Sequence, residues 1–402
     1  MYDREKTPNI FEAILKYGYD EDFEKAITTL KGNDMEYIQS GKMSVLVDGQ
    51  FGSTGKGLLA AYLASQPGNE VDVAVTNAAA NAGHTTRFKD NPDRDFVCFH
   101  MPTFGVIQDC DIYLNAGAII NPDIFLQEIE TMDIKADRVY VHPNAAVIDE
   151  ETKEEAKKVS RSGSTQKGVG LALMKKVGRR GSYVARDELK LKPFVRPFDL
   201  EERLRKGQRV SLEVPQGFSL GLNQQFFPYS TSRECSVMAG LNDACINPYY
   251  LGKVSMSIRT FPIRVGNIHD EHGDVIGWSG PHYDDQNELT WEEVGVEPEV
   301  TTVTKRVRRV FTFSMQQFED AVKANRPDII FLNFMNYLPE QEGADLAVNL
   351  HQRWDFLMNS ELGKLWTPSM GSGEWLYGFG PCVEDVYETY LNRTEWNEKE
   401  KA

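Results

Sequence analysis

The chain has 402 residues, with 60 acidic and 44 basic side chains and a formal net charge of −16. Apolar residues make up 41% and charged residues 26%, which is typical of a soluble globular protein, and no apolar run approaches the roughly 20 residues of a membrane helix. The acidic excess argues against a nucleic-acid partner, because binding to phosphates needs clustered Lys and Arg. The first 40 residues resemble no targeting peptide, so we expect a cytoplasmic protein that binds no membrane.

The order of the predicted elements indicates the fold class. Residues 1–42 form an extension with helical spacing at 10–15 and 23–30. Runs typical of strands follow at 43–47, 71–75, 112–114, 139–141 and 329–332, and runs typical of helices at 58–63 and 123–132. Strands that alternate with helices predict an α/β fold with a mostly parallel central sheet flanked by helices. Because no repeat or linker is evident, we expect 43–402 to be a single domain.

A glycine-rich turn at 48–57 joins the first predicted strand to the first predicted helix. Gly52, Gly55 and Gly57 let backbone N–H groups approach a phosphate, the helix N-terminus favours an anion, and Lys56 adds a positive charge. The turn is not a Walker A loop, which has Ser or Thr where Gly57 stands. We therefore expect a phosphate-binding loop of another type.

A second segment, 81–85, reads Asn-Ala-Gly-His-Thr. Gly83 permits a sharp turn, and His84 stands among small residues with little bulky cover. A histidine can donate a proton or a hydrogen bond to a developing oxyanion. Taken alone, the segment leaves a capping or buried structural role for His84 equally open.

Metal-binding spacings are absent from the sequence. The five cysteines are scattered without a Cys-x-x-Cys pair, which favours reduced thiols over a zinc site. The run His-Asp-Glu-His at 269–272 is followed at once by Gly273, so we interpret it as a solvated turn.

These segments resemble the adenylosuccinate synthetase family, and five further motifs strengthen the resemblance. The family's phosphate loop, Gln-Trp-Gly-Asp-Glu-Gly-Lys-Gly, corresponds to 50–57, and its Asn-Ala-Gly-His-Thr stands unchanged at 81–85. The other similar stretches are 163–170, 179–181, 213–217, 227–232 and 303–309. The matches keep their order from about 43 to 381, which argues against coincidence.

The resemblance implies a fold related to P-loop proteins and a two-stage, Mg²⁺-dependent ligation by a homodimer. A nucleoside triphosphate phosphorylates O6 of a purine monophosphate, and the amine of L-aspartate then displaces the phosphate. The resemblance makes Ser53 and His84 catalytic. The implied triphosphate-binding residues are Gly52, Ser53, Thr54, Gly55, Lys56, Gly57, Gly83, His84, Thr85, Gly380 and Pro381.

The same resemblance assigns the other ligands. The purine nucleotide would contact Ser53, Asn81, Ser164, Thr165, Gln216 and Thr231, and Arg179 from the neighbouring subunit. L-Aspartate would contact Val303, Thr304, Arg306 and Arg308, where forked guanidinium groups suit carboxylates. Mg²⁺ would contact Ser53 and the Gly83 carbonyl. For each arginine, a solvated surface charge is the competing interpretation.

One departure from the family changes the expected substrate. Where the family has an Asp that removes the purine N1 proton and binds Mg²⁺, this chain has Ser53. A serine hydroxyl can coordinate Mg²⁺ but is a poor general base at neutral pH. The smaller, uncharged side chain leaves room beside N1 and C2 for a 2-amino group. The same replacement is typical of the phage branch of the family, which makes the succinyl precursor of 2-aminoadenine from dGMP.

A second departure concerns the phosphate donor. Members that use GTP read guanine with a Thr-Lys-Leu-Asp segment after a late strand, and the corresponding stretch 332–336 has neither Lys nor Asp. We therefore expect ATP or dATP as donor. In the aspartate loop, Val303 and Lys305 replace Thr and Gly.

We predict a C–N ligase of purine nucleotide biosynthesis that condenses dGMP with L-aspartate. The products would be 2-amino-2′-deoxy-N6-succinyladenylate, ADP or dADP, and phosphate, made in the host cytoplasm if the chain is phage-encoded. One alternative is a conventional adenylosuccinate synthetase acting on IMP, which an Asp at position 53 would have favoured. The other is a catalytically silent nucleotide-binding relative, against which the joint presence of Lys56, His84, Arg306 and Arg308 argues.

Overall fold

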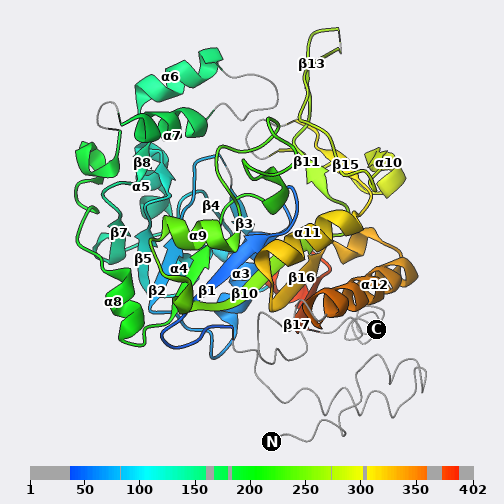
Figure 1. The fold of residues 1–402 in the computed structure, drawn as a ribbon, viewed down its shortest axis with the longest axis horizontal. Coiled ribbons are helices and arrows are strands. Elements are labelled where there is room, and N and C mark those ends of the chain that lie inside the picture. The colour runs from blue at the N-terminus through cyan, green and yellow to red at the C-terminus, as the bar shows by residue number, and fades with distance from the viewer. Residues whose placement is uncertain are drawn as a thin grey trace, which may run out of the picture.

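A nine-stranded sheet forms the centre of the structure, a computed structural model that describes residues 37–388 except 82, 160–166, 180–182, 273, 302–305 and 360–373 (Figure 1). In spatial order its strands are β18 (Val386–Tyr387), β17 (Glu374–Gly378), β16 (Ile329–Asn333), β10 (Leu251–Arg259), β1 (Met43–Asp48), β9 (Val210–Glu213), β2 (Val73–Thr76), β5 (Asp111–Leu114) and β7 (Val139–Val141). All neighbours pair in parallel except β17 and β18. The predicted α/β class and mostly parallel sheet are confirmed.

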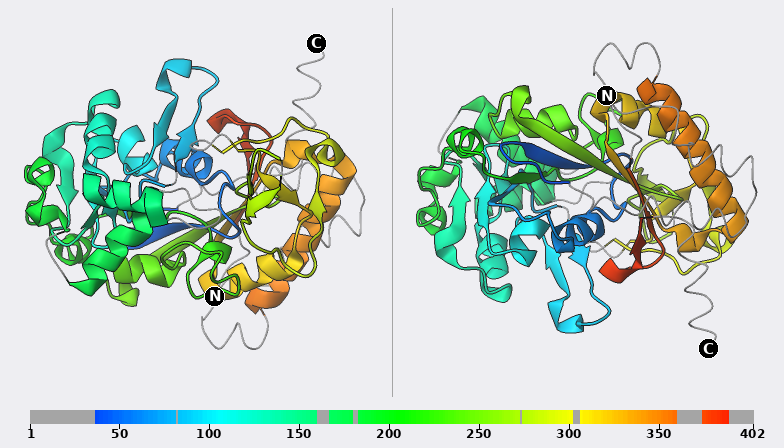
Figure 2. Two further views of the ribbon diagram at one scale, coloured as in Figure 1. Left: turned by 90° about the horizontal axis from the view of Figure 1, so that it is seen from above. Right: turned by 90° about the horizontal axis from the view of Figure 1, so that it is seen from below.

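Helices cover both faces of the sheet, as Figure 2 shows. One face packs against α8 (Leu200–Arg205), α9 (Val237–Asp243), α11 (Met315–Asn325) and α12 (Glu340–Asn359). The other packs against α3 (Lys56–Ser65), α4 (Thr103–Ile107) and α5 (Pro122–Thr131). Because both faces are covered, β1 is buried at every residue, which explains its continuous apolar run.

Smaller elements lie at the margins of the main sheet. Two-stranded pairs are formed by β3 (His84–Thr86) with β4 (Phe96–Cys98), β6 (Ile119–Ile120) with β8 (Ala146–Val147), and β12 (Ile268–His269) with β13 (Val275–Gly277). A three-stranded sheet contains β11 (Ile263–Arg264), β15 (Arg309–Phe311) and β14 (Glu288–Leu289), next to α10 (Trp291–Val294). The remaining helices are α6 (Glu150–Val159) and α7 (Val169–Gly178).

The predicted elements that the structure describes are present, with boundaries shifted by one to two residues. The strand expected at 71–75 begins at Val73, and the helix expected at 58–63 begins two residues earlier, at Lys56. Asn121 caps α5 as predicted, since its side-chain oxygen accepts from the backbone N–H groups of Asp123 and Ile124. The helices expected at 10–15 and 23–30 lie outside the described residues.

The end of the predicted extension is part of the packed core. Tyr37 and Ile38 are fully buried. Their backbone N–H groups both donate to the side-chain oxygen of Asn69, at N···O distances of 2.8 and 3.2 Å. Ser40 forms a bridge with Arg209 beside β9. Residues 37–42 therefore pack against the main sheet. The division into a 1–42 extension and a single 43–402 domain stays a prediction.

One further expectation from sequence, a turn at the end of the run 269–272, agrees with the structure. The run at 269–272 ends a short strand and enters a turn, in which the Asp270 carboxylate accepts from the backbone of His272 and Asp274, each over 2.9 Å. No group of three metal-binding side chains lies together in the part of the chain that is described. Within the same residues, no helix has the length and apolar character needed to span a bilayer.

Candidate functional site

The loop between β1 and α3 is built around the Asp48 carboxylate. Oδ1 accepts from the backbone of Gln50 over 2.9 Å and of Gly52 over 3.2 Å. Oδ2 accepts from the Thr54 hydroxyl at a distance of 2.6 Å. That hydroxyl is also 2.6 Å from Oγ of Ser257 on β10. Asp48 is 1% exposed, so these N–H and O–H donors compensate a buried charge. The carboxylate therefore determines the shape of the loop.

Three residues at the top of the loop, Gly52, Ser53 and Gly55, have positive φ. Gly52 and Gly55 have φ of 88° and 87°, and Ser53 adopts the same region at 58° despite its side chain. A Cβ on Gly55 would come 2.0 Å from the Asn333 side-chain nitrogen at the end of β16. That nitrogen donates to the Thr54 carbonyl over 3.2 Å. The loop thus needs glycine at position 55 for both conformation and space, while the Ser53 side chain is left exposed.

Lys56 begins α3 and is 5% exposed. Its Nζ donates to the Gln216 carbonyl over 2.9 Å. Burial lowers the pKa of the Lys56 ammonium, and the nearby Asp48 carboxylate opposes this shift. A phosphate placed over the loop would offer this ammonium a charged acceptor in place of a neutral carbonyl.

The second motif lies directly beside the first turn of α3. A Cβ on Gly57 would come 3.0 Å from the Cβ of His84 and 3.1 Å from the Thr85 carbonyl. His84 Nδ1 lies 3.7 Å from Oε2 of Glu213, the last residue of β9. The other oxygen, Glu213 Oε1, accepts from the Phe104 backbone over 3.1 Å. A buried carboxylate therefore faces the His84 ring, an arrangement that orients imidazole groups in acid–base sites.

The residues expected to bind the purine nucleotide are only partly described. Asn81 Oδ1 is buried without a hydrogen-bond partner among the described residues, so it is an available acceptor next to the His84 turn. Gln216 has φ of 68°, and its Oε1 is 3.7 Å from Cys235 Sγ. Thr231 is half-buried, with its backbone N–H bonded to the Leu220 carbonyl over 2.7 Å. Ser164 and Thr165 lie outside the described residues.

Arg179 ends α7 in the left-handed region, with φ of 52°, and is exposed. Its expected contact across a subunit interface stays a prediction.

The segment expected to bind aspartate is a hairpin. The Glu299 carbonyl accepts from the Arg308 backbone and the Arg306 carbonyl from Thr301, each over 2.8 Å. Val303 and Thr304 lie outside the described residues. Arg306 and Arg308 are half-buried, and burial lowers the pKa of Arg308. By contrast, Arg309 forms a two-pronged ion pair with Glu288, in which both N···O distances are 2.6 Å.

Gly380 and Pro381 follow β17 and lie near the His84 strand. A Cβ on Gly380 would come 2.3 Å from the Asp385 carboxylate, and the backbone N–H of Val383 donates to the Arg87 carbonyl over 2.9 Å. Asp385 also pairs with Lys89. The 379–387 turn is thus bonded to the segment that follows β3. Pro381 is exposed.

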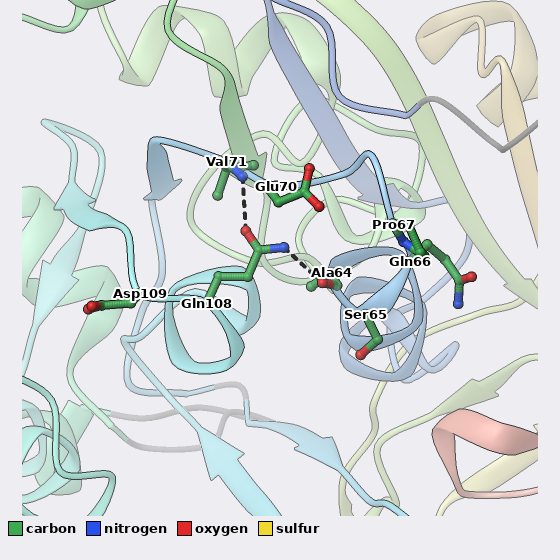
Figure 3. A pocket seen from close by; sticks show the side chains of 8 residues that line it. All are labelled: Ala64, Ser65, Gln66, Pro67, Glu70, Val71, Gln108 and Asp109. Atoms are coloured by element: carbon green, nitrogen blue, oxygen red, sulfur yellow. Dashed lines mark hydrogen bonds between the residues drawn. The ribbon is translucent and has the colours of Figure 1, made fainter.

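A pocket of about 510 Å³ lies elsewhere, at the carboxyl end of α3 (Figure 3). Gln108 bridges its two sides, donating to the Ala64 carbonyl over 2.8 Å and accepting from the Val71 backbone over 2.9 Å. Because α3 begins at Lys56, this pocket is at the opposite end of the helix from the phosphate loop. It is no part of the candidate site.

Comparisons with known proteins agree with the motifs. A family model described as adenylosuccinate synthetase matches residues 45–196. The N6-succino-2-amino-2′-deoxyadenylate synthase of Salmonella phage PMBT28 is 37% identical over 371 residues, which cover 86% of this chain and 97% of that protein. The chain belongs to the adenylosuccinate synthetase family.

Two further matches place it near the phage members of that family. The N6-succino-2-amino-2′-deoxyadenylate synthase of Acinetobacter phage SH-Ab 15497 is 38% identical over 337 residues, covering 75% of this chain and 86% of that protein. A solved structure of the cyanophage S-2L succinoaminodeoxyadenylate synthetase, bound to dGMP and dATP as an energy donor, has a TM-score of 0.75 at 30% identity. The superposed part covers 89% of this chain and 99% of the S-2L chain. The predicted family and the predicted ligase class are confirmed.

Several residues that build the site were not singled out from the sequence. Asp48, Arg259 and Asn333 shape the phosphate loop, and Glu213 faces His84. Each is a polar residue at the carboxyl end of a buried strand, where ligands of parallel sheets bind. For Asp48, which directly follows the predicted strand 43–47, this position was a signal available in the sequence.

The steric requirement at position 55 can be tested with a matched pair of glycines. Gly55→Ala adds a clash with Asn333 to the cost of a positive φ, whereas Gly68→Ala, at φ 85° with nothing within 4 Å, adds only the backbone cost. We expect Gly68→Ala to lower the free energy of unfolding by about 1–2 kcal/mol and keep triphosphate binding. Gly55→Ala should cost more and abolish binding, as measured by urea unfolding and calorimetric titration. Equal effects of the two variants would contradict the described loop.

Proposed function

We propose that this enzyme condenses dGMP with L-aspartate, driven by transfer of the γ-phosphate of ATP or dATP to O6, to give 2-amino-2′-deoxy-N6-succinyladenylate, ADP or dADP, and phosphate. The observation that carries the proposal is Ser53, an exposed hydroxyl at the top of the phosphate loop where the family resemblance leads one to expect a carboxylate. The names of the phage relatives, and the dGMP and dATP in the S-2L structure, point to the same substrates.

The reaction needs two steps because a purine carbonyl oxygen is a poor leaving group. O6 first attacks the γ-phosphorus of the triphosphate, the bond to the β-phosphate oxygen breaks, and the diphosphate leaves. The aspartate amine then attacks C6, the C6–O6 bond breaks, and the phosphate leaves with O6. The N1 proton and one amine proton are released overall. Such transfers are accelerated mainly by positioning and by electrostatic stabilisation of the developing charge.

The phosphate loop supplies the first part of this stabilisation. We assign the triphosphate to the N–H groups at 52–57 and to Lys56, whose Nζ is held at the Gln216 carbonyl at a distance of 2.9 Å. Thr85, Gly380 and Pro381 would line the same ligand. The stretch 332–336 has neither the Lys nor the Asp with which GTP-using relatives are expected to read guanine, which supports an adenine nucleotide as donor.

His84 would act at O6 of the purine. Its ring lies beside the N-terminus of α3 and faces the buried Glu213 carboxylate at 3.7 Å. In the doubly protonated ring, Nδ1–H would face this carboxylate and Nε2–H would be left to donate to O6. The ring can therefore hold, and donate a hydrogen bond to, the oxygen on which negative charge develops.

The remaining substrate contacts follow the family resemblance. We assign dGMP to Ser53, Asn81, Ser164, Thr165, Gln216 and Thr231, with Arg179 reaching it from the second subunit of a homodimer. The unpartnered Asn81 Oδ1 supports this placement. We assign L-aspartate to Val303, Thr304, Arg306 and Arg308. We place the enzyme in the cytoplasm of the host cell.

We infer that Mg²⁺ enters with the triphosphate. The oxygens available to it from this chain are neutral, namely the exposed Ser53 hydroxyl and the exposed Gly83 carbonyl, because both Asp48 oxygens already accept hydrogen bonds within the loop. This donor set fits a cation that keeps waters and binds mainly to substrate phosphates. When bound, Mg²⁺ would neutralise charge on the triphosphate.

The substrate assignment can be tested by an end-point assay read by mass spectrometry. The enzyme is incubated with Mg²⁺, aspartate and ATP, with dGMP, GMP or IMP offered separately. We expect the succinyl product from dGMP, because position 53 leaves space for the 2-amino group. Ser53→Ala should keep the preference for dGMP at a lower rate, whereas Ser53→Asp should shift it towards IMP.

Succinylation of IMP alone by the unaltered enzyme would overturn the substrate assignment. Triphosphate hydrolysis without product from any of the three purines would favour a silent relative.

A second prediction concerns His84. His84→Ala should reduce ligation by ~10²–10⁴-fold, because the group that stabilises charge at O6 is lost. The affinities for dGMP and triphosphate should change little, as measured by calorimetric titration. The exposed His272, with a side chain 76% accessible, provides the control, since His272→Ala should leave both rate and affinity unchanged. Full activity of His84→Ala would show that the ring has only a structural role.

A further inference from the structure

The Arg259 side chain lies buried between the phosphate loop and the hairpin, which is described where 299–301 pair with 306–308, and 0% of its surface is exposed. Its Nη1 donates to the Ser53 carbonyl over 3.0 Å and to Glu299 Oε2 over 3.2 Å, and its Nη2 donates to Glu299 Oε1. The guanidinium lies over the Phe334 ring, 3.8 Å from the ring centroid. A buried cation is tolerated only with such compensation, so its orientation depends on all of these partners.

The backbone of Arg259 is also joined to the loop. Its N–H donates to the Gln50 side-chain oxygen over 3.0 Å, and the Gln50 side-chain nitrogen donates back to its carbonyl over 3.2 Å. Because β10 and β1 are neighbouring parallel strands, Arg259 cannot shift without disturbing the residues that form the loop.

Glu299, the partner of Arg259, begins the hairpin that carries Arg306 and Arg308. Its carbonyl accepts from the Arg308 backbone over 2.8 Å, and one residue pair further on Val300 bridges Val307. Its carboxylate also accepts from the Tyr337 hydroxyl over 3.2 Å. The position of the hairpin stem is therefore determined by a carboxylate whose main partner also holds the top of the phosphate loop.

We propose that the Arg259–Glu299 ion pair couples the two substrate sites, so that triphosphate on the loop raises the affinity of the hairpin for a dicarboxylate. The proposal rests on the proposed function, which places these two ligands. A bound triphosphate holds the loop in the conformation in which the Ser53 carbonyl accepts from Arg259. The other N–H groups of the guanidinium are then directed at Glu299, which holds the hairpin stem. Arg259 and Glu299 are positioning residues in this account.

Linkage makes the proposal measurable without turnover. If triphosphate raises the affinity for a dicarboxylate by some factor, the dicarboxylate raises the affinity for triphosphate by the same factor. Succinate is a suitable dicarboxylate because it has no amine to react. The triphosphate ligand is an imido analogue of ATP, which cannot transfer its γ-phosphate.

The experiment titrates the imido analogue and Mg²⁺ into the enzyme with and without saturating succinate. For the unaltered enzyme we expect the dissociation constant to fall by ~5-fold or more when succinate is present. Glu299→Gln, which removes the charge but keeps the shape, should bring this ratio to about 1, with little change in the constant measured without succinate. Glu299→Asp keeps the charge with a shorter reach and should give an intermediate ratio.

Glu288→Gln is the matched control. Glu288 forms a similar two-pronged pair with Arg309 in the adjacent small sheet, so its carboxylate is bonded to Arg309 and not to the phosphate loop. This variant should keep the ratio of the unaltered enzyme. A Glu299→Gln ratio equal to that of the unaltered enzyme, or an equal loss in Glu288→Gln, would overturn the proposal. Since neither dGMP nor turnover is used, failure of the dGMP assignment would leave this result interpretable.

Discussion

A single buried carboxylate gives the phosphate loop its shape. Asp48 accepts three backbone N–H groups and the Thr54 hydroxyl at the end of the central strand β1, and it is 1% exposed. Four donors directed at one charge determine the path of the loop around it, and the remaining N–H groups are left for an anion. The same use of both oxygens leaves Asp48 unable to bind a metal ion. The exposed Ser53 is therefore the residue of this loop that we propose as the contact to the purine.

The other functional groups reach the site from strands on both sides of β1. Glu213 at the end of β9 faces His84, while Arg259 at the end of β10 holds Ser53 and Glu299. Parallel strands bring these carboxyl ends to one edge of the sheet, so residues far apart in sequence converge there. In this account the sheet supplies position and the loops supply chemistry, and the ion pair of Arg259 joins two of those loops.

The sequence predicts those parts of the fold that depend on local patterns. The apolar run before the glycine loop, and the Asn-Pro start of α5, are local signals, and both elements are present. The strand β10 was missed because Ser255, Ser257 and Arg259 interrupt its apolar pattern, although all three are buried, Ser257 and Arg259 with polar partners. The roles of Arg259 and Glu299 depend on contacts 40 residues apart, which no local pattern contains. The resemblance of the motifs identifies the candidate site, but only the tertiary contacts show how its residues are positioned.

The central claim is that a hydroxyl at position 53 leaves space for the 2-amino group of guanine. A crystal structure of the enzyme with dGMP and Mg²⁺ tests it most directly. The account predicts that the C2 edge of the base faces Ser53, with the 2-amino nitrogen in the space that a longer carboxylate side chain would fill. A base whose C2 edge points away from Ser53, with no room there for an amine, would contradict the account.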